Sequence, residues 1–205
     1  MQMHRISGRA DWANVKQADR NGWQRLASRT HGSVTPGNAV TVIGAGIATV
    51  ALVLITQHHY WVGVALLAVG RLCDLLDGYL ADLTGTKGPI GELLDVVADK
   101  LISLGCAIVF LVAHIMPLWL LVGLAAPQFI TVGVKVLFAA HKPIRPTRSG
   151  KISMALLWLC LLGFLLDQAT GTHALVRTVA YVLGFASILV GLYANRAYYD
   201  EARAK

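Results

Sequence analysis

Six long stretches of this chain consist almost entirely of apolar residues, and short polar segments separate them. They cover about residues 39–56, 60–81, 93–114, 117–140, 152–167 and 174–194. A helix needs roughly 20 mostly apolar residues to cross the hydrocarbon core of a membrane. The fifth stretch is short and could extend into its flanks. The pattern therefore predicts an all-α integral membrane protein, with residues 33–205 forming one bundle of six transmembrane helices.

The residues before the first apolar stretch have a different pattern. Between residues 11 and 30, apolar side chains such as Trp12, Trp23 and Leu26 recur at helical spacing, with Arg and Lys on the other faces. This spacing predicts an amphipathic juxtamembrane helix at the interface, with the tryptophans at headgroup level. A solvated, partly disordered arm is the alternative. We assign residues 1–32 to this cytoplasmic N-terminal arm.

Composition and charge support the same class of protein. Hydrophobic residues make up 56% of the chain and charged residues only 14%, which is typical of a multi-pass membrane protein. Lys and Arg precede the first span, follow the last, and occupy the loops at 82–92 and 141–151, whereas the other three loops contain none. The positive-inside rule then predicts that both termini and these two loops are cytoplasmic, in a cell inner or plasma membrane. Attraction to anionic lipid explains the net charge of +7 better than nucleic-acid binding, which we do not expect.

Four aspartates interrupt the second and third apolar stretches: Asp74, Asp77, Asp95 and Asp99. The first two are spaced i, i+3 and the last two i, i+4, so each pair shares one face of its helix. A short loop joins the two helices as antiparallel neighbours, so all four carboxylates can converge near the inner leaflet. Unpaired carboxylates at membrane depth cost about 2.5–3.5 kcal/mol each or more, and divalent metal is the simplest source of the missing positive charge.

Oxygen ligands at this density suit magnesium, manganese or calcium, and two ions could be held. A two-metal clamp typically serves displacement at phosphorus. The intramembrane carboxylates of a proton or ion transporter are an alternative reading.

Small residues flank these acids at Gly78, Ala81 and Gly91. They would let a flat or bulky ligand approach the backbone. The alternative is that they only allow close packing of helices in lipid.

The acids and small residues together resemble the signature of the CDP-alcohol phosphotransferase family, Asp-x2-Asp-Gly-x2-Ala-Arg-x8-Gly-x3-Asp-x3-Asp. This chain has Asp74-x2-Asp77-Gly78-x2-Ala81-Asp82-x8-Gly91-x3-Asp95-x3-Asp99, which matches every spacing and seven of the eight specified positions. The resemblance extends over roughly residues 33–196, and the residues within the motif are most similar to those of the phosphatidylglycerophosphate synthase branch.

The resemblance implies a transfer reaction in phospholipid biosynthesis. A CDP-linked lipid, usually CDP-diacylglycerol, places its diphosphate on two Mg²⁺ or Mn²⁺ ions, an acceptor alcohol attacks the phosphorus that bears the lipid, and CMP leaves. By family analogy Asp74, Asp77 and Asp95 ligate metal, while Asp99 ligates the second metal and takes the acceptor's proton. The resemblance also implies a homodimer.

The CDP-lipid site implied by the resemblance includes Gly78, Ala81, Asp82 and Gly91. Asp82 is the one departure, since it replaces the family's arginine near the nucleotide phosphates. Either another cation such as Lys87 or Arg71 neutralises the diphosphate, or activity is weak or absent and the chain is a catalytically silent relative.

The acceptor is inferred from basic residues that could face the cytoplasmic cavity. Lys135 lies deep in the fourth span, and Arg148, Lys151 and Arg196 lie at the inner ends of the last two. Together they predict a phosphate-binding pocket. Snorkelling of Lys135 and ordinary positive-inside flanking by the others are the alternatives.

A phosphorylated polyol fits this pocket best. The lysine after Asp99 and the Gly150-Lys151 pair favour glycerol 3-phosphate as the acceptor. The basic trio of Lys135, Arg148 and Arg196 instead resembles phosphatidylinositol phosphate synthases, which use inositol 1-phosphate.

Overall fold

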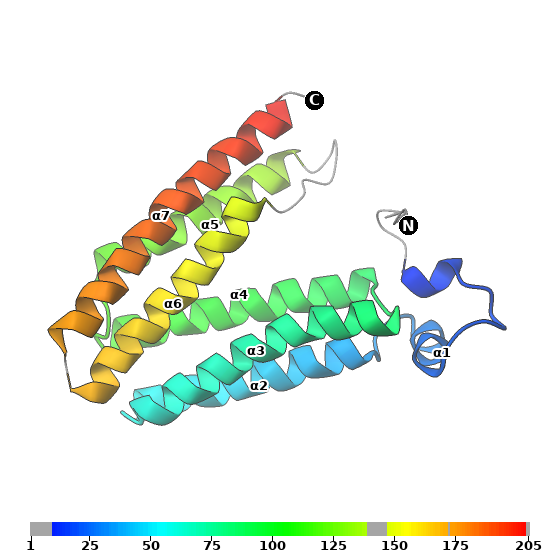
Figure 1. Ribbon diagram of the computed structural model, residues 1–205, viewed down its shortest axis with the longest axis horizontal. Coiled ribbons are helices and arrows are strands. Elements are labelled where there is room, and N and C mark those ends of the chain that lie inside the picture. The colour runs from blue at the N-terminus through cyan, green and yellow to red at the C-terminus, as the bar shows by residue number, and fades with distance from the viewer. Residues whose placement is uncertain (1–9, 139–146, 172, 204–205) are drawn as a thin grey trace. The chain divides into compact units, whose positions relative to one another are not determined.

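The computed structural model describes residues 10–138, 147–171 and 173–203, and in this part of the chain every regular element is a helix (Figure 1). Its elements are η1 (Asp11–Asn14), α1 (Gly22–Arg29), α2 (Pro36–Thr56), α3 (Tyr60–Thr84), α4 (Pro89–Val112), α5 (Leu118–Phe138), α6 (Arg148–Thr170) and α7 (Ala174–Arg203). The prediction of an all-α fold is confirmed for these residues, which contain no strand. The helices α2 to α7 correspond one by one to the six apolar stretches of the sequence.

Local sequence fixes several helix ends. Thr35 caps α2 by accepting a hydrogen bond from the Asn38 backbone N–H, and Pro36 occupies the first helical position, where its missing N–H costs nothing. Thr147 caps α6 in the same way through the Gly150 N–H. Gly171 ends α6 in the left-handed conformation that favours glycine, with φ of 83°.

Three segments of the described chain are long and apolar enough to cross a membrane: Pro36–Thr56, Arg148–Thr170 and Ala174–Ala197. A shorter apolar segment runs from Leu118 to Thr131. α3 and α4 do not meet the criterion among the described residues, and each carries four charged side chains. These findings support a helical membrane protein, and the count of six spans stays a prediction.

The chain forms two compact units. The first comprises residues 1–58 and 65–106, and the second comprises residues 59–64 and 107–205. The first therefore holds α1, α2 and most of α3 and α4, whereas α5, α6 and α7 belong to the second.

Small residues bring α2 and α3 together in the first unit. A Cβ added at Gly44 would lie 2.7 Å from the Cβ of Cys73, and one added at Gly70 would lie 3.2 Å from the Gly44 carbonyl oxygen. Helices that pack in lipid commonly approach this closely through small residues. The contact sets α2 against the face of α3 that also carries Asp77.

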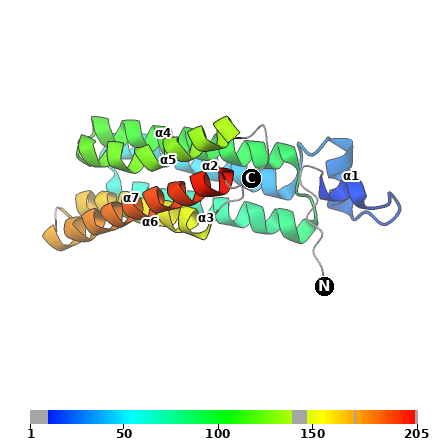
Figure 2. The same ribbon diagram turned by 90° about the horizontal axis from the view of Figure 1, so that it is seen from above.

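The N-terminal arm differs from the prediction of one interfacial helix over residues 11–30. It consists of the short helix η1 and the eight-residue helix α1, because Asn21 and Gln24 form a reciprocal capping box that starts a new helix at Gly22. Figures 1 and 2 show this arm beyond the ends of α2, α3 and α4 within the first unit.

The two tryptophans of the arm lie in different surroundings. Trp12 is only 7% exposed, so its ring packs within the protein, and its place at headgroup level stays a prediction. Its ring lies against Gly32 and Gly88, where an added Cβ would come within 2.7 Å and 2.6 Å of it. Trp23 on α1 is 51% exposed, and Leu26 is exposed as well. The amphipathic part of the arm is therefore restricted to α1.

Polar contacts join the helices of the second unit. Ser153 on α6 and Ser187 on α7 donate hydrogen bonds to each other's backbone carbonyls, at 2.9 and 2.8 Å. Asn195 on α7 donates to the Pro127 carbonyl of α5 at 2.9 Å and accepts from Thr131. Such paired polar groups hold helices together in apolar surroundings.

Candidate metal centre

Three of the four predicted acids come together in the first unit. Carboxylate oxygens of Asp74 and Asp77 on α3 and Asp95 on α4 all lie within 4.8 Å of one another. Asp77 is 6% exposed, and its Oδ2 accepts a hydrogen bond of 2.5 Å from the Thr41 hydroxyl on α2. Three helices therefore position this group, which we call the acidic cluster.

Asp99 lies beside the acidic cluster rather than within it. The Arg71 guanidinium contacts Asp99 Oδ1 through Nη1 at 3.0 Å and Asp74 Oδ2 through Nη2 at 3.0 Å. Lys100 Nζ lies 3.9 Å from Asp99 Oδ2. Arg71 thus links the two acid-bearing helices, and it stands three residues before Asp74, a spacing from which the sequence could have indicated the contact.

The donor set of the acidic cluster fits a hard divalent cation. Carboxylate oxygens brought this close repel one another, and a bound ion relieves that repulsion while using them as ligands. The cluster could therefore hold a metal ion such as Mg²⁺ or Mn²⁺, as the sequence predicts.

The small residues of the motif have different surroundings. A Cβ added at Gly91 would lie 2.8 Å from Asn38 Oδ1, so close packing accounts for this glycine. Ala81 also packs closely, since its Cβ would lie 3.2 Å from one added at Gly37. Gly78 is different, because an added Cβ would meet nothing within 4 Å among the described residues. Packing therefore does not explain Gly78, and approach of a ligand to its backbone stays a prediction.

The departure from the motif, Asp82, forms an ion pair. Its Oδ1 lies 2.7 Å from Lys87 Nζ, and the two side chains are 65% and 42% exposed. Lys87, one of the two cations expected to neutralise the diphosphate, is thus paired with Asp82 itself, and its role toward a diphosphate stays a prediction.

The loop that joins the two acid-bearing helices contacts the N-terminal arm. The Asn21 side chain donates to the Thr84 carbonyl at 3.1 Å, and the Gln24 side chain donates to the Gly85 carbonyl at 3.3 Å. Gly85 has a φ of 62°, a conformation that favours glycine. Nothing in the periodicity of the arm indicated these contacts.

The four predicted acceptor residues belong to the second unit: Lys135 on α5, Arg148 and Lys151 on α6, and Arg196 on α7. The latter three are exposed, and the side chain of Lys135 lies outside the described part. Arg148 and Lys151 are spaced i, i+3 in the first turn of α6 and share one face. The predicted phosphate pocket stays a prediction.

Comparisons with known proteins agree with the motif. A family model described as CDP-alcohol phosphatidyltransferase matches residues 34–192. Curated proteins of Mycobacterium bovis and Mycobacterium tuberculosis, both named "Putative cardiolipin synthase", are 28% identical to the chain over 160 residues. The matched region covers 77% of this chain and 66% of these relatives, so it spans just under two thirds of their length.

Proposed function

The chain belongs to the CDP-alcohol phosphatidyltransferase family, and from this membership we propose that it transfers a phosphatidyl group from CDP-diacylglycerol to an acceptor alcohol with release of CMP. The observation that carries the proposal is the convergence of Asp74, Asp77 and Asp95 within 4.8 Å. The proposed acceptor is a phosphorylated polyol, with glycerol 3-phosphate first.

The acidic cluster would hold the divalent ions. Asp74, Asp77 and Asp95 are the proposed ligands, and Asp99 would join them for a second ion. A divalent ion bound there would supply positive charge for the diphosphate and for the oxygens of departing CMP.

The residues of the chain have separate proposed roles in the transfer. The hydroxyl oxygen of the acceptor alcohol forms a bond to the lipid-bearing phosphorus, and an Asp99 carboxylate oxygen accepts the proton of that hydroxyl. The bond from this phosphorus to the oxygen of CMP breaks, and CMP leaves with the electron pair. Arg71, which contacts Asp99 and Asp74 at 3.0 Å, holds both carboxylates in position for these roles.

The proposed CDP-lipid site is formed by Gly78, Ala81, Asp82 and Gly91. The open space at Gly78 supports approach of the nucleotide to the α3 backbone at that residue. The pairing of Asp82 with Lys87 supports a neutral surface there, which does not repel a diphosphate as an isolated carboxylate would.

We also propose the topology expected from the sequence. α2 to α7 would cross the membrane six times, with both termini and the acidic cluster on the cytoplasmic side and a homodimer as the functional assembly. The alternation of basic loops supports this orientation.

The acceptor has two further candidates. Lys135, Arg148, Lys151 and Arg196 would bind an acceptor phosphate, and this set also suits inositol 1-phosphate. A second candidate function is cardiolipin synthesis, which the name of the mycobacterial relatives favours and which requires a different acceptor. Cardiolipin contains two phosphatidyl groups on one glycerol, so its synthesis by this chemistry would use phosphatidylglycerol.

One assay tests the proposal and ranks the acceptors. Purified full-length protein is incubated with CDP-diacylglycerol and Mg²⁺ or Mn²⁺, and with glycerol 3-phosphate, inositol 1-phosphate or phosphatidylglycerol in turn, and released CMP is measured. We expect CMP and the phosphatidyl product in equal amounts with one acceptor, and none with Asp77→Asn. Absence of CMP with every acceptor would favour a catalytically silent relative in which Asp82 has ended activity.

A further inference from the structure

A cavity of about 580 Å³ lies in the second unit, between the α4–α5 turn and the α6–α7 turn. Its volume is within the range of about 300–1,000 Å³ that small-molecule sites occupy. About half of its lining is apolar, with Leu111, Ile115, Met116, Leu118 and Phe164 among the lining residues. None of the lining residues belongs to the acidic cluster.

A buried carboxylate lines this cavity. Asp167, in the last turn of α6, is 1% exposed, although its position at the end of an apolar stretch suggests a loop. Its Oδ2 accepts a hydrogen bond of 2.9 Å from Arg177 Nε on α7. Its Oδ1 is buried and has no hydrogen-bond partner among the described residues. Because buried polar atoms are nearly always hydrogen-bonded, this oxygen can accept from a donor that a ligand brings.

Arg177 adds a positive group to the same cavity. It is partly exposed, and only its Nε donates to a described residue, so the two Nη groups can still donate. A guanidinium in this state binds phosphate through charge-assisted hydrogen bonds.

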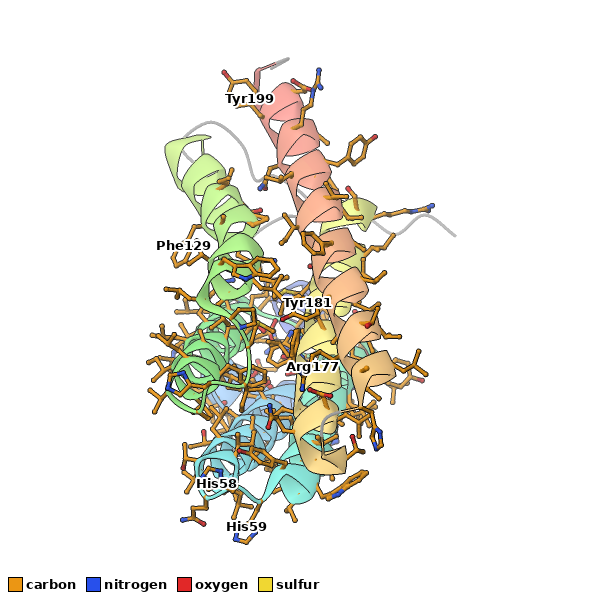
Figure 3. All side chains as sticks on the ribbon, turned by 90° about the vertical axis from the view of Figure 1, so that its left-hand side faces the viewer. His58, His59, Phe129, Arg177, Tyr181 and Tyr199 are labelled. Carbon is orange, nitrogen blue, oxygen red and sulfur yellow. The ribbon has the colours of Figure 1, made fainter. Side chains whose placement is uncertain are left out.

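An aromatic wall stands next to Arg177. Tyr181 follows it by one turn on α7, and Figure 3 labels both residues. The Tyr181 ring stacks on Trp119 at 5.9 Å between centroids and meets Phe164 edge-on at 5.0 Å. Both contacts hold the ring in place beside the ion pair.

The charge balance of the cavity selects its ligand. The Asp167–Arg177 pair carries no net charge. A matching ligand presents an anionic group to Arg177 and a hydrogen-bond donor to Asp167 Oδ1. A zwitterion meets both demands without adding net charge to the cavity. A carboxylate accepts more strongly from an ammonium than from a hydroxyl, because that hydrogen bond is charged on both sides. The apolar walls suit hydrocarbon next to this headgroup.

We propose that this cavity binds a zwitterionic phospholipid, with its phosphate on Arg177 and its primary ammonium donating to Asp167 Oδ1. A soluble phosphorylated amine has the same polar chemistry, and the apolar walls favour the lipid. The proposal does not depend on the transfer reaction.

Headgroup selectivity of the unmodified protein tests this directly. The full-length protein in a maltoside detergent is titrated calorimetrically with dihexanoyl-phosphatidylethanolamine below its micelle concentration, then with the phosphatidylcholine of equal chain length, which has no N–H donor. We expect the first to bind about tenfold more tightly, since the charged hydrogen bond to Asp167 is lost in the second. Equal affinities would overturn the proposal, and so would tighter binding of dihexanoyl-phosphatidylglycerol.

The source of the headgroup is tested in the same experiment. Soluble glycerophosphoethanolamine should bind at least about tenfold more weakly than the lipid, because it leaves the apolar walls uncovered. Equal binding would contradict a lipid site and indicate a soluble phosphorylated amine.

Two variants and a control locate the site. Asp167→Asn should remove the preference for ethanolamine over choline to within about twofold, and Arg177→Gln should weaken both lipids by about tenfold. His173→Gln, an exposed change in the same turn outside the cavity lining, should bind as the unmodified protein does. An unchanged ethanolamine preference in Asp167→Asn would refute the assignment of the ammonium to Asp167. If that variant does not fold, the comparison of headgroups on the unmodified protein still tests the proposal.

Discussion

Replacing Thr41 by valine removes one hydroxyl from beside the acidic cluster and changes the shape of the side chain little. The Thr41 Oγ1 lies 2.5 Å from Asp77 Oδ2 and 3.1 Å from the Gly37 carbonyl oxygen. The Thr41 hydroxyl has one hydrogen, and we assign it to the shorter hydrogen bond, which the charged Asp77 carboxylate accepts. Asp77 is 6% exposed, so water does not readily replace this donor.

The expected magnitude follows from the charge and burial of Asp77. A hydrogen bond to a charged group contributes about 1.5–3 kcal/mol, and a buried acceptor left unpaired costs a similar amount. We therefore expect Thr41→Val to lower the free energy of unfolding by about 2 kcal/mol in the absence of divalent ions. Loss of the group that orients a metal-binding carboxylate typically costs 10–100-fold in affinity, so we expect the dissociation constant for Mn²⁺ to rise by about tenfold.

Two measurements and one control variant test this reasoning. Unfolding in mixed micelles is followed by circular dichroism, and Mn²⁺ binding is followed by electron paramagnetic resonance. Thr49→Val makes the same change on the same helix, where the exposed hydroxyl donates to the Ala45 carbonyl at 2.8 Å and to no other described residue. That control should stay within about 0.5 kcal/mol of the unmodified protein. Equal results for the two variants in both measurements would refute the role assigned to Thr41.

Three further changes test packing, catalysis and ligand approach. Gly44→Ala should lower the free energy of unfolding by about 1–3 kcal/mol, because its Cβ would lie 2.7 Å from that of Cys73, and a stabilised variant would contradict the close approach of α2 and α3. Its control, Gly46→Ala, meets nothing within 4 Å in the described part of the chain and should raise the free energy of unfolding by up to about 1 kcal/mol. Asp99→Asn should abolish CMP release while circular dichroism still reports a folded helical protein, and full turnover would rule out Asp99 as the base. Gly78→Ala should leave thermal stability unchanged or higher and raise KM for CDP-diacylglycerol, whereas an unchanged KM would show that the nucleotide does not approach this residue.

The features that the sequence predicted correctly depend on local patterns. Each apolar stretch is long enough to define a helix, so the bounds of α2 to α6 lie within four residues of the predicted ones. α7 begins at the predicted residue but continues to Arg203, beyond the predicted end at 194. The spacing of Asp74 and Asp77 fixes their common face, and the four-residue loop between α3 and α4 makes the two helices neighbours. Convergence with Asp95 follows from these two facts.

The features that the sequence did not reveal depend on contacts between distant segments. Trp12 has the spacing of an interfacial residue, yet Gly32 and Gly88 leave a space that its ring fills. Asp99 has the spacing of a fourth ligand, but Arg71 reaches it across the helix pair. The position of Asp167 at the end of an apolar stretch indicates a loop residue, but its side chain is buried and pairs with Arg177, ten residues later. Each outcome depends on a partner that periodicity does not identify.

The central claim, that Asp74, Asp77 and Asp95 form a divalent metal site, is tested most directly by Mn²⁺ titration of the purified full-length protein. Asp77→Asn removes a buried acid of the acidic cluster. Asp82→Asn removes an exposed acid of the same helix, which pairs with Lys87 and does not belong to the cluster. We predict that the first variant weakens Mn²⁺ binding by at least about tenfold and that the second changes it by no more than about twofold. Equal weakening in both variants, or no Mn²⁺ binding by the unmodified protein, would contradict the account.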